Sequence, residues 1–383
     1  MRTRRDFLLG SGAALGYVGL TQTGLPLLAA SQPSPAAYTG ANSLAARAAR
    51  TKLPYGCAVA PERLDVDEEY TRAIVEQCSI LVAENAMKWG PIHPQPDKYN
   101  FAAADKLMAF AAKHKMQVRG HNLCWHQSLP PWFASTVNKQ NAEKILVQHI
   151  QTVAGRYAGK IHSWDVVNEA VHPSDGLHNG MRNSPWMQLL GERYIDIAFQ
   201  TARAADPHAL LTYNDYGIEY DTPWDDRRRE AVLALLHRMR QRGVPIDAAG
   251  VQSHLHAGTK NYFDGGLKHF MKEAHKLNLQ VFVTELDVDD AHVIGSEGAR
   301  EQAVAAVYKD YMNRMLQYPW MTAALTWGIA NRSTWLNHQH PRTDGAQQVP
   351  LPLDANYQPT PAFFALREAF DRRKVQSDAS SRA

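Results

Sequence analysis

The chain has 383 residues, of which 45% are hydrophobic and 21% charged, and 41 Lys and Arg against 38 Asp and Glu give a net charge of +3. This is the composition of a folded globular protein and excludes wholesale disorder. So small a charge also excludes the strong basic field of a dedicated nucleic-acid binder. Three cysteines, Cys57, Cys78 and Cys124, are too few for a disulfide-built scaffold and have no CxxC zinc spacing. Each lies in or beside an apolar run, so we expect buried, unreactive thiols.

The first 30 residues have the features of an export signal. Arg4 and Arg5 precede a short apolar stretch that ends near Leu20, and small residues surround Ala30. The arginine pair resembles the twin-arginine export motif, and the apolar stretch is short for a membrane span. We therefore expect residues 1–30 to be a signal peptide and the mature protein to be exported, periplasmic or extracellular, with no membrane attachment. A signal anchor or a chance arginine pair is the alternative.

A single domain is predicted for most of the remaining chain. Residues 31–42 are rich in Pro, Ser and Gly and are expected to form a tether. Ser43 is expected to cap a short helix at 44–50, where the domain begins. The domain extends to residue 373, and the polar residues 374–383 are expected to fray.

Within this domain, short apolar runs alternate with amphipathic stretches. Strands are predicted at 55–59, 79–83, 117–121, 162–168, 210–214, 248–252, 281–285 and 323–327. Helices are predicted between them at 105–115, 142–157, 193–205, 227–242, 267–276 and 297–317. Continuous apolar strands that alternate with helices indicate an α/β fold with a parallel sheet. Eight such units predict a closed (β/α)8 barrel, a TIM barrel, rather than an open sheet.

Polar and aromatic side chains gather where these strands end, which is where a barrel of this kind places its chemistry. Glu169 and Glu285 stand out, because each follows an apolar run and burial there can raise the pKa of a carboxyl group. Either glutamate alone could be an ion-pair partner. Two at matched positions, flanked by Asn168 and Asp287, favour a catalytic pair.

Paired carboxylates in an aromatic cleft suit glycoside hydrolysis. One carboxyl group protonates the leaving oxygen while the other attacks or activates water, and Trp faces stack on sugar rings. Strands four and seven face one another across the barrel mouth. We therefore expect the short carboxylate separation of a retaining enzyme, about 5–5.5 Å.

The residues at the strand ends also resemble those of a known family. From about residue 43 to 372 the chain is similar to glycoside hydrolase family 10, the (β/α)8 endo-β-1,4-xylanases. The motifs that carry this resemblance are Glu84-Asn85-Ala86-Met87-Lys88-Trp89, Gly120-His121-Asn122-Leu123-Cys124-Trp125-His126, Trp164-Asp165-Val166-Val167-Asn168-Glu169, Tyr213-Asn214-Asp215-Tyr216, Gly250-Val251-Gln252-Ser253-His254 and Thr284-Glu285-Leu286-Asp287.

The resemblance implies a retaining double displacement on internal bonds of xylan or xylo-oligosaccharides, with no cofactor and no metal, by a monomer. It implies that Glu169 is the acid/base, that Glu285 is the nucleophile, and that His254 and Asp287 orient and tune Glu285. The substrate-binding residues it implies are Glu84, Asn85, Lys88, His121, Trp125, Asn168, Tyr216, Gln252, Trp327 and Trp335.

The sequence departs from the family pattern in three places. Gln127 and Ser128 are swapped, Gly217 replaces a common Asn, and Asn331 replaces a common Asp. All three concern contacts with the sugar and not the two glutamates. We therefore expect differences in subsite preference rather than in the reaction.

The same residues allow other functional interpretations. His254 and His256 form an HxH pair of the kind that binds zinc in metal hydrolases, but the later strand ends supply no further His ligand. An oxidoreductase would need a cofactor motif, and a sugar-binding protein would need no glutamate pair. An endo-β-1,4-glucanase is the nearest alternative. Finally, Trp89, Trp132 and Trp164 are expected to be core residues.

Overall fold

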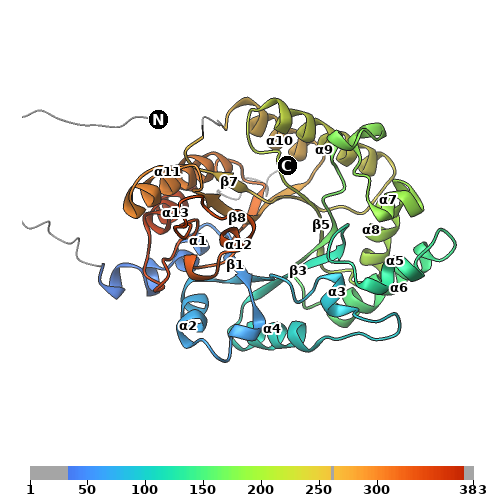
Figure 1. Cartoon of the computed structure of the whole chain (residues 1–383), viewed down its shortest axis with the longest axis horizontal. Helices are drawn as coiled ribbons and strands as arrows, with labels where there is room; N and C mark the ends of the chain where they lie inside the picture. The colour runs from blue at the N-terminus through green and yellow to red at the C-terminus, as the bar shows by residue number, and fades with distance from the viewer. Residues whose placement is uncertain (1–32, 260–262, 375–383) are drawn as a thin grey trace, which may run out of the picture.

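Eight parallel strands form a closed barrel surrounded by helices, as Figure 1 shows for the computed structural model. The structure describes residues 33–259 and 263–374. The barrel strands are β1 (Tyr55–Val59), β2 (Ile80–Ala83), β3 (Gln117–Cys124), β4 (Ser163–Asn168), β5 (Leu210–Asp215), β6 (Ala248–Val251), β8 (Gln280–Asp289) and β9 (Met321–Thr326). Pairing of β6 with β8 and of β1 with β9 closes the ring. The predicted (β/α)8 fold is confirmed.

Two strands extend further than the apolar runs predicted. β3 continues past His121 to Cys124, and β8 continues past Glu285 to Asp289. A short additional strand, β7 (His254–His256), pairs with this extension of β8, with His254 opposite Asp287. The extensions carry polar residues away from the barrel core and towards the mouth.

Long helices connect the strands and cover the outside of the barrel. They are α2 (Glu68–Gln77), α4 (Ala102–Lys113), α6 (Ala142–Arg156), α8 (Arg193–Ala205), α9 (Pro223–Gln241), α10 (Gly265–Lys276), α11 (Glu297–Met315) and α13 (Pro361–Arg372). The six predicted helices are present, whereas α2 and α13 were not predicted. Asp67 caps α2 by accepting a hydrogen bond from the Tyr70 amide (2.9 Å), and Pro361 begins α13.

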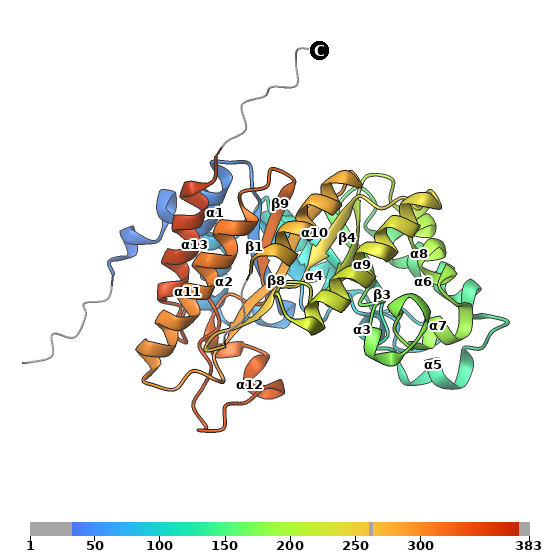
Figure 2. The same cartoon turned by 90° about the horizontal axis from the view of Figure 1, so that it is seen from above.

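Short helices gather at one end of the barrel, along the lower edge of Figure 2. They are α3 (Trp89–Ile92), α5 (Pro131–Thr136), α7 (Pro185–Leu190) and α12 (Leu336–Gln339). Each lies in a connection that follows a strand, so they build the rim at the carboxyl ends of the strands. In the described ranges no helix has the length and apolar character that a bilayer crossing requires.

The segment before the barrel differs from the expected tether. Residues 33–42 form two turns, η1 (Pro35–Ala37) and η2 (Gly40–Asn42). Tyr38 lies between them: its hydroxyl donates to Gln358 (3.0 Å) and its carbonyl accepts from Gln77 (3.0 Å). These contacts hold the segment against the barrel. Ser43 then caps α1 (Leu44–Ala49), as predicted. The predicted signal peptide, residues 1–30, and all but the first residue of the predicted tail lie outside the described residues.

The three cysteines are buried free thiols, as expected. Burial raises the pKa of Cys124 well above the ordinary thiol value, which disfavours the reactive thiolate. Trp89 and Trp164 are buried in the core, as predicted, and Trp132 packs half-buried against it.

An ion pair lies inside the barrel. The guanidinium of Arg119 on β3 contacts the carboxylate of Asp165 on β4, and both side chains are almost completely buried. Arg119 also donates to the hydroxyl of Ser163 (3.0 Å), and Asp165 accepts from His121 Nδ1 (2.9 Å). Because Asp165 joins Arg119 to His121, the pair supports a residue predicted to bind sugar.

We expect Arg119→Met to lower the free energy of unfolding by about 3–5 kcal/mol, because it leaves the Asp165 carboxylate buried without its main partner. Urea denaturation measures the change. The matched control is Arg156→Met, which removes an ion pair with Asp105 in which both side chains are over 40% exposed and should cost less than about 1 kcal/mol. Equal losses in the two variants would contradict this account of the buried pair.

Candidate active site

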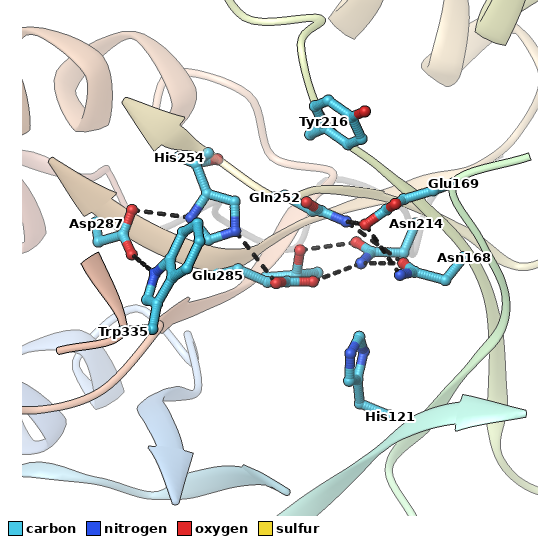
Figure 3. A network of polar contacts seen from close by, with 12 residues as sticks. His121, Asn168, Glu169, Asn214, Tyr216, Gln252, His254, Glu285, Asp287 and Trp335 are labelled. Atoms are coloured by element: carbon cyan, nitrogen blue, oxygen red, sulfur yellow. Dashed lines mark hydrogen bonds and ion pairs between the residues drawn. The ribbon is translucent and has the colours of Figure 1, made fainter. Parts of the chain in front are cut away.

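The predicted site residues all line one open cleft of about 890 Å³ at the carboxyl ends of the strands. Figure 3 shows how its central side chains meet. Glu285 lies within β8, and Glu169 directly follows β4. The backbone of Glu169 has a left-handed φ of 57°, which costs a non-glycine residue about 1–2 kcal/mol. Its amide donates to the Asn214 carbonyl (2.9 Å) and its carbonyl accepts from Arg182 (2.6 Å), so the conformation is held from both sides.

A chain of side-chain amides connects the two glutamates. Asn214 Nδ2 donates to Glu285 Oε1 (2.8 Å) and to Asn168 Oδ1 (2.9 Å). Asn168 Nδ2 and Gln252 Nε2 both donate to Glu169 Oε1, at 3.3 and 3.0 Å. The amides fix the two carboxyl groups relative to each other, with a common hydrogen-bond network between them (Figure 3).

Glu285 is held as a carboxylate. Burial opposes ionisation, but hydrogen bonds from His254 Nε2 (3.3 Å) and Asn214, with the charge of nearby histidines, lower the pKa of Glu285 to about 2. His254 Nδ1 contacts Asp287 Oδ1 (2.8 Å), and Asp287 Oδ2 accepts from the Trp335 indole (2.7 Å). Burial disfavours the charged form of His254, yet its two carboxylate neighbours raise its pKa well above the usual value. The imidazolium therefore stabilises the ionised form of Glu285.

Glu169 has the opposite character. Burial raises its pKa above the ordinary glutamate value, so it favours the protonated form over a wider pH range. Two basic side chains lie near it at the limit of ion-pair distance: His126 Nδ1 and Arg182 Nη2 are both 3.9 Å from Glu169 Oε2. Burial lowers the pKa of His126 to about 3, so that ring is neutral near pH 7. One glutamate is thus set up as an acid and the other as a carboxylate.

On one side of the pair, polar side chains are framed by aromatic rings. Lys88 Nζ donates to Asn85 Oδ1 (2.8 Å) and lies 5.2 Å from the Trp125 ring and 5.8 Å from the Trp327 ring. Burial lowers the pKa of Lys88 and raises that of Glu84. Such a mixture of apolar faces and hydrogen-bonding groups suits sugar rings, which present CH faces and hydroxyl edges. The assigned roles of these residues stay predictions.

The three departures from the family pattern have different places. Gln127 lines the cleft, whereas the Ser128 carbonyl accepts from the Gly90 amide (2.7 Å) in the supporting loop. Asn331 is buried and its Oδ1 accepts from the Leu351 amide (2.9 Å), so it supports the loop that follows β9. Gly217 lines the cleft beside Tyr216.

Sequence reasoning gave no role to two residues of the site. Asn214 belongs to the Tyr213-Asn214-Asp215-Tyr216 motif, and its position near the end of β5 was a usable signal. Arg182 lies in a loop far from any strand end, yet it donates to the Glu169 carbonyl and to the Tyr216 hydroxyl (3.1 Å). Nothing in its local sequence marked it.

The two histidines of the HxH pair contact different partners. His254 joins Glu285 to Asp287, while His256 Nδ1 lies 3.7 Å from Asp289. Across residues 33–259 and 263–374, no cluster of three or more His, Cys, Asp or Glu side chains is arranged to hold a metal ion.

Comparison with known proteins identifies the family. The profile of glycosyl hydrolase family 10 matches residues 43–369. Endo-1,4-beta-xylanase B of Thermotoga neapolitana is 35% identical over 309 residues, which cover 80% of this chain and 84% of that protein. Beta-1,4-xylanase of Dictyoglomus thermophilum is also 35% identical, over 78% of this chain and 83% of its own.

Solved structures of similar proteins indicate the same family. Native xylanase 10B of Thermotoga maritima superposes with a TM-score of 0.79 at 32% identity and covers 86% of this chain and 98% of its own. Xylanase 10B of Thermotoga petrophila, solved with xylobiose, gives the same TM-score and identity over 86% of this chain and 97% of its own. The profile spans nearly the whole barrel, including every residue of the glutamate network, and on these findings the chain belongs to glycosyl hydrolase family 10.

Proposed function

We propose that the chain is an endo-1,4-β-xylanase that cleaves internal bonds of xylan and xylo-oligosaccharides with retention of anomeric configuration. The observation that carries this is the pair of buried glutamates, Glu169 and Glu285, whose pKa values are shifted in opposite directions while side-chain amides join them. The open cleft supports internal cleavage, because a polymer can pass through it. The relatives that are named as xylanases support xylan as the substrate.

In the first step, the Glu285 carboxylate attacks the anomeric carbon and the bond to the leaving sugar oxygen breaks. Glu169 gives its proton to that oxygen, so the leaving sugar departs as a neutral alcohol. A glycosyl ester of Glu285 remains. We assign to Asn168, whose amide contacts Glu169, a bond to a sugar hydroxyl that gains charge in the oxocarbenium-like transition state.

In the second step, water replaces the departed sugar. Esterification has removed the negative charge of Glu285, which lowers the pKa of Glu169 and leaves it a carboxylate. Glu169 takes a proton from the water while the water oxygen bonds to the anomeric carbon. The ester bond breaks, and Glu285 is released as a carboxylate. Two inversions give net retention.

The choice between xylan and cellulose is tested by kcat/KM on the two soluble polysaccharides under one set of conditions. We expect xylan to be strongly preferred, with a mixture of short oligosaccharides as products. A preference for cellulose would move the proposal to the endoglucanase alternative. Hydrolysis of neither would overturn it.

His254→Gln should shift the pH profile, because it keeps a neutral donor near Glu285 but removes the positive charge. Activity is lost at low pH as Glu285, whose pKa is about 2 in the native protein, becomes protonated. Without the charge that pKa rises, so the acid limb of kcat/KM should move to higher pH by about one unit or more. The control is His256→Gln, whose ring faces Asp289. An unmoved acid limb in His254→Gln would contradict the assigned interaction.

We also propose that residues 1–30 direct export and that the mature protein is an unattached monomer. The support is the arginine pair Arg4-Arg5 before a short apolar stretch. A fusion of these residues to a folded reporter tests export. Loss of export in the Arg4→Lys, Arg5→Lys double variant is the expected result, and unchanged export would contradict the twin-arginine assignment.

A further inference from the structure

Trp224 lies at the edge of the cleft, beside Tyr216. It lies in the first turn of α9, where Pro223 begins the helix and Thr222 caps it by accepting from the Asp225 amide (3.2 Å). Trp224 is 38% exposed and lines the same cleft as the two glutamates. A Trp with this exposure presents part of a large apolar ring to the cleft, where a ligand can stack on it.

Tyr216 and Trp224 form one aromatic surface. Their ring centroids are 6.2 Å apart and their planes are inclined by 36°. The guanidinium of the buried Arg228 lies 4.1 Å from the Tyr216 centroid and 5.1 Å from the Trp224 centroid. Asp215 (2.5 Å) and the Tyr216 carbonyl (2.9 Å) fix Arg228 in turn. Both rings are therefore supported before any ligand binds, which reduces the entropy lost on binding.

Gly217 makes room for the indole. Its φ is +65°, and a Cβ atom at this position would lie 2.2 Å from Cζ3 of Trp224. That distance is far inside van der Waals contact, so any larger residue would displace the ring. The indole of Trp224 can thus occupy its position only because residue 217 has no side chain.

We propose that Trp224, in the space left by Gly217, is a stacking surface for a xylose unit of the leaving chain, one unit beyond the sugar at Tyr216. Figure 3 places Tyr216 on the Glu169 side of the network, away from His121. A chain that leaves the reacting centre over Tyr216 is then within reach of Trp224, whose ring centroid is 6.2 Å from that of Tyr216. This inference rests on the proposed function, because it assumes a xylan chain in the cleft.

The test compares substrates with and without that distal sugar. We expect Trp224→Ala to lower kcat/KM on xylopentaose by about five- to tenfold, the scale of one aromatic stacking contact. An aryl β-xylobioside has only its aryl group beyond the scissile bond, so its kcat/KM should not change. Trp224→Phe should recover most of the loss. The matched control is Val66→Ala, an exposed hydrophobic residue outside the cleft lining.

A second variant separates binding from folding. Gly217→Asn suits the left-handed backbone, since Asn tolerates positive φ, but its Cβ must displace the indole. It should reproduce the selective loss on xylopentaose, and the double variant should lose no more than Trp224→Ala alone.

Equal losses of Trp224→Ala on both substrates, or no loss on either, would overturn the inference, as would additive losses in the double variant. Failure of the native protein to hydrolyse either substrate would instead count against the proposed function.

Discussion

Glu285→Ala is expected to abolish hydrolysis of xylan, with kcat lowered by about 10⁴-fold or more. The variant lacks the carboxylate that attacks the anomeric carbon, and the amides of Asn214 and Asn168 cannot replace it. Binding should survive, because the aromatic faces and the hydroxyl-binding groups remain. Single-turnover kinetics and titration of xylotetraose binding measure the two effects separately.

The alanine also leaves a space at the anomeric carbon. With an activated aryl xyloside, azide should enter that space and give a xylosyl azide of inverted configuration. The matched control is Glu230→Ala, at an exposed glutamate that pairs with His269 on the outer helices, which should leave activity unchanged. Hydrolysis of xylan by Glu285→Ala at the native rate would contradict its assignment as the nucleophile.

Glu169→Ala has the second largest expected effect, and its size should depend on the leaving group. On xylan the loss should be about 10²- to 10⁴-fold, because the poor alcohol leaving group requires protonation. On an aryl xyloside with an acidic phenol, formation of the glycosyl ester should proceed at close to the native rate. The ester should then accumulate, since no base remains to activate water.

A burst of phenol followed by a slow steady state measures this difference. Azide should speed the second step and give a xylosyl azide of retained configuration, opposite to the product of Glu285→Ala. Equal losses on the two substrates would contradict the acid/base assignment of Glu169.

The barrel could be predicted from the sequence because its strands are buried on both faces. Runs such as 281–283 are continuous apolar segments, and their alternation with amphipathic helices leaves few topologies open. The extension of β8 to Asp289 could not be predicted in this way. In this extension, residues 286–289, apolar and acidic residues alternate, and it stays extended because β7 pairs with it, which is a tertiary effect.

The same reasoning separates the parts of the site that could be found from those that could not. Glu169, Glu285 and His254 stand at or just after the ends of predicted strands, and a parallel barrel brings all strand ends to one face. Arg182 comes from a loop whose path depends on contacts across the rim, and no local pattern fixes that path. Trp224 reads as an ordinary residue of a helix start until its distance from Gly217 is known.

The packing of the expected tether against the barrel is a third feature that the sequence could not predict. Its Pro, Ser and Gly content favours a flexible linker, but Tyr38 gives it an anchor. That ring packs edge-on against Phe363 with centroids 6.3 Å apart, and Gln77 and Gln358 satisfy its polar groups. Composition alone does not reveal such partners, since they lie on α2 and next to α13, distant in the sequence.

The central claim is that Glu169 and Glu285 carry out a double displacement on internal β-1,4-xylosidic bonds. Proton NMR during the first minutes of xylohexaose hydrolysis tests it most directly, because the anomer of a new reducing end is seen before mutarotation. The account predicts that the β-anomer of xylobiose, xylotriose and xylotetraose appears first. Initial appearance of the α-anomer, or release of single xylose units only, would contradict it.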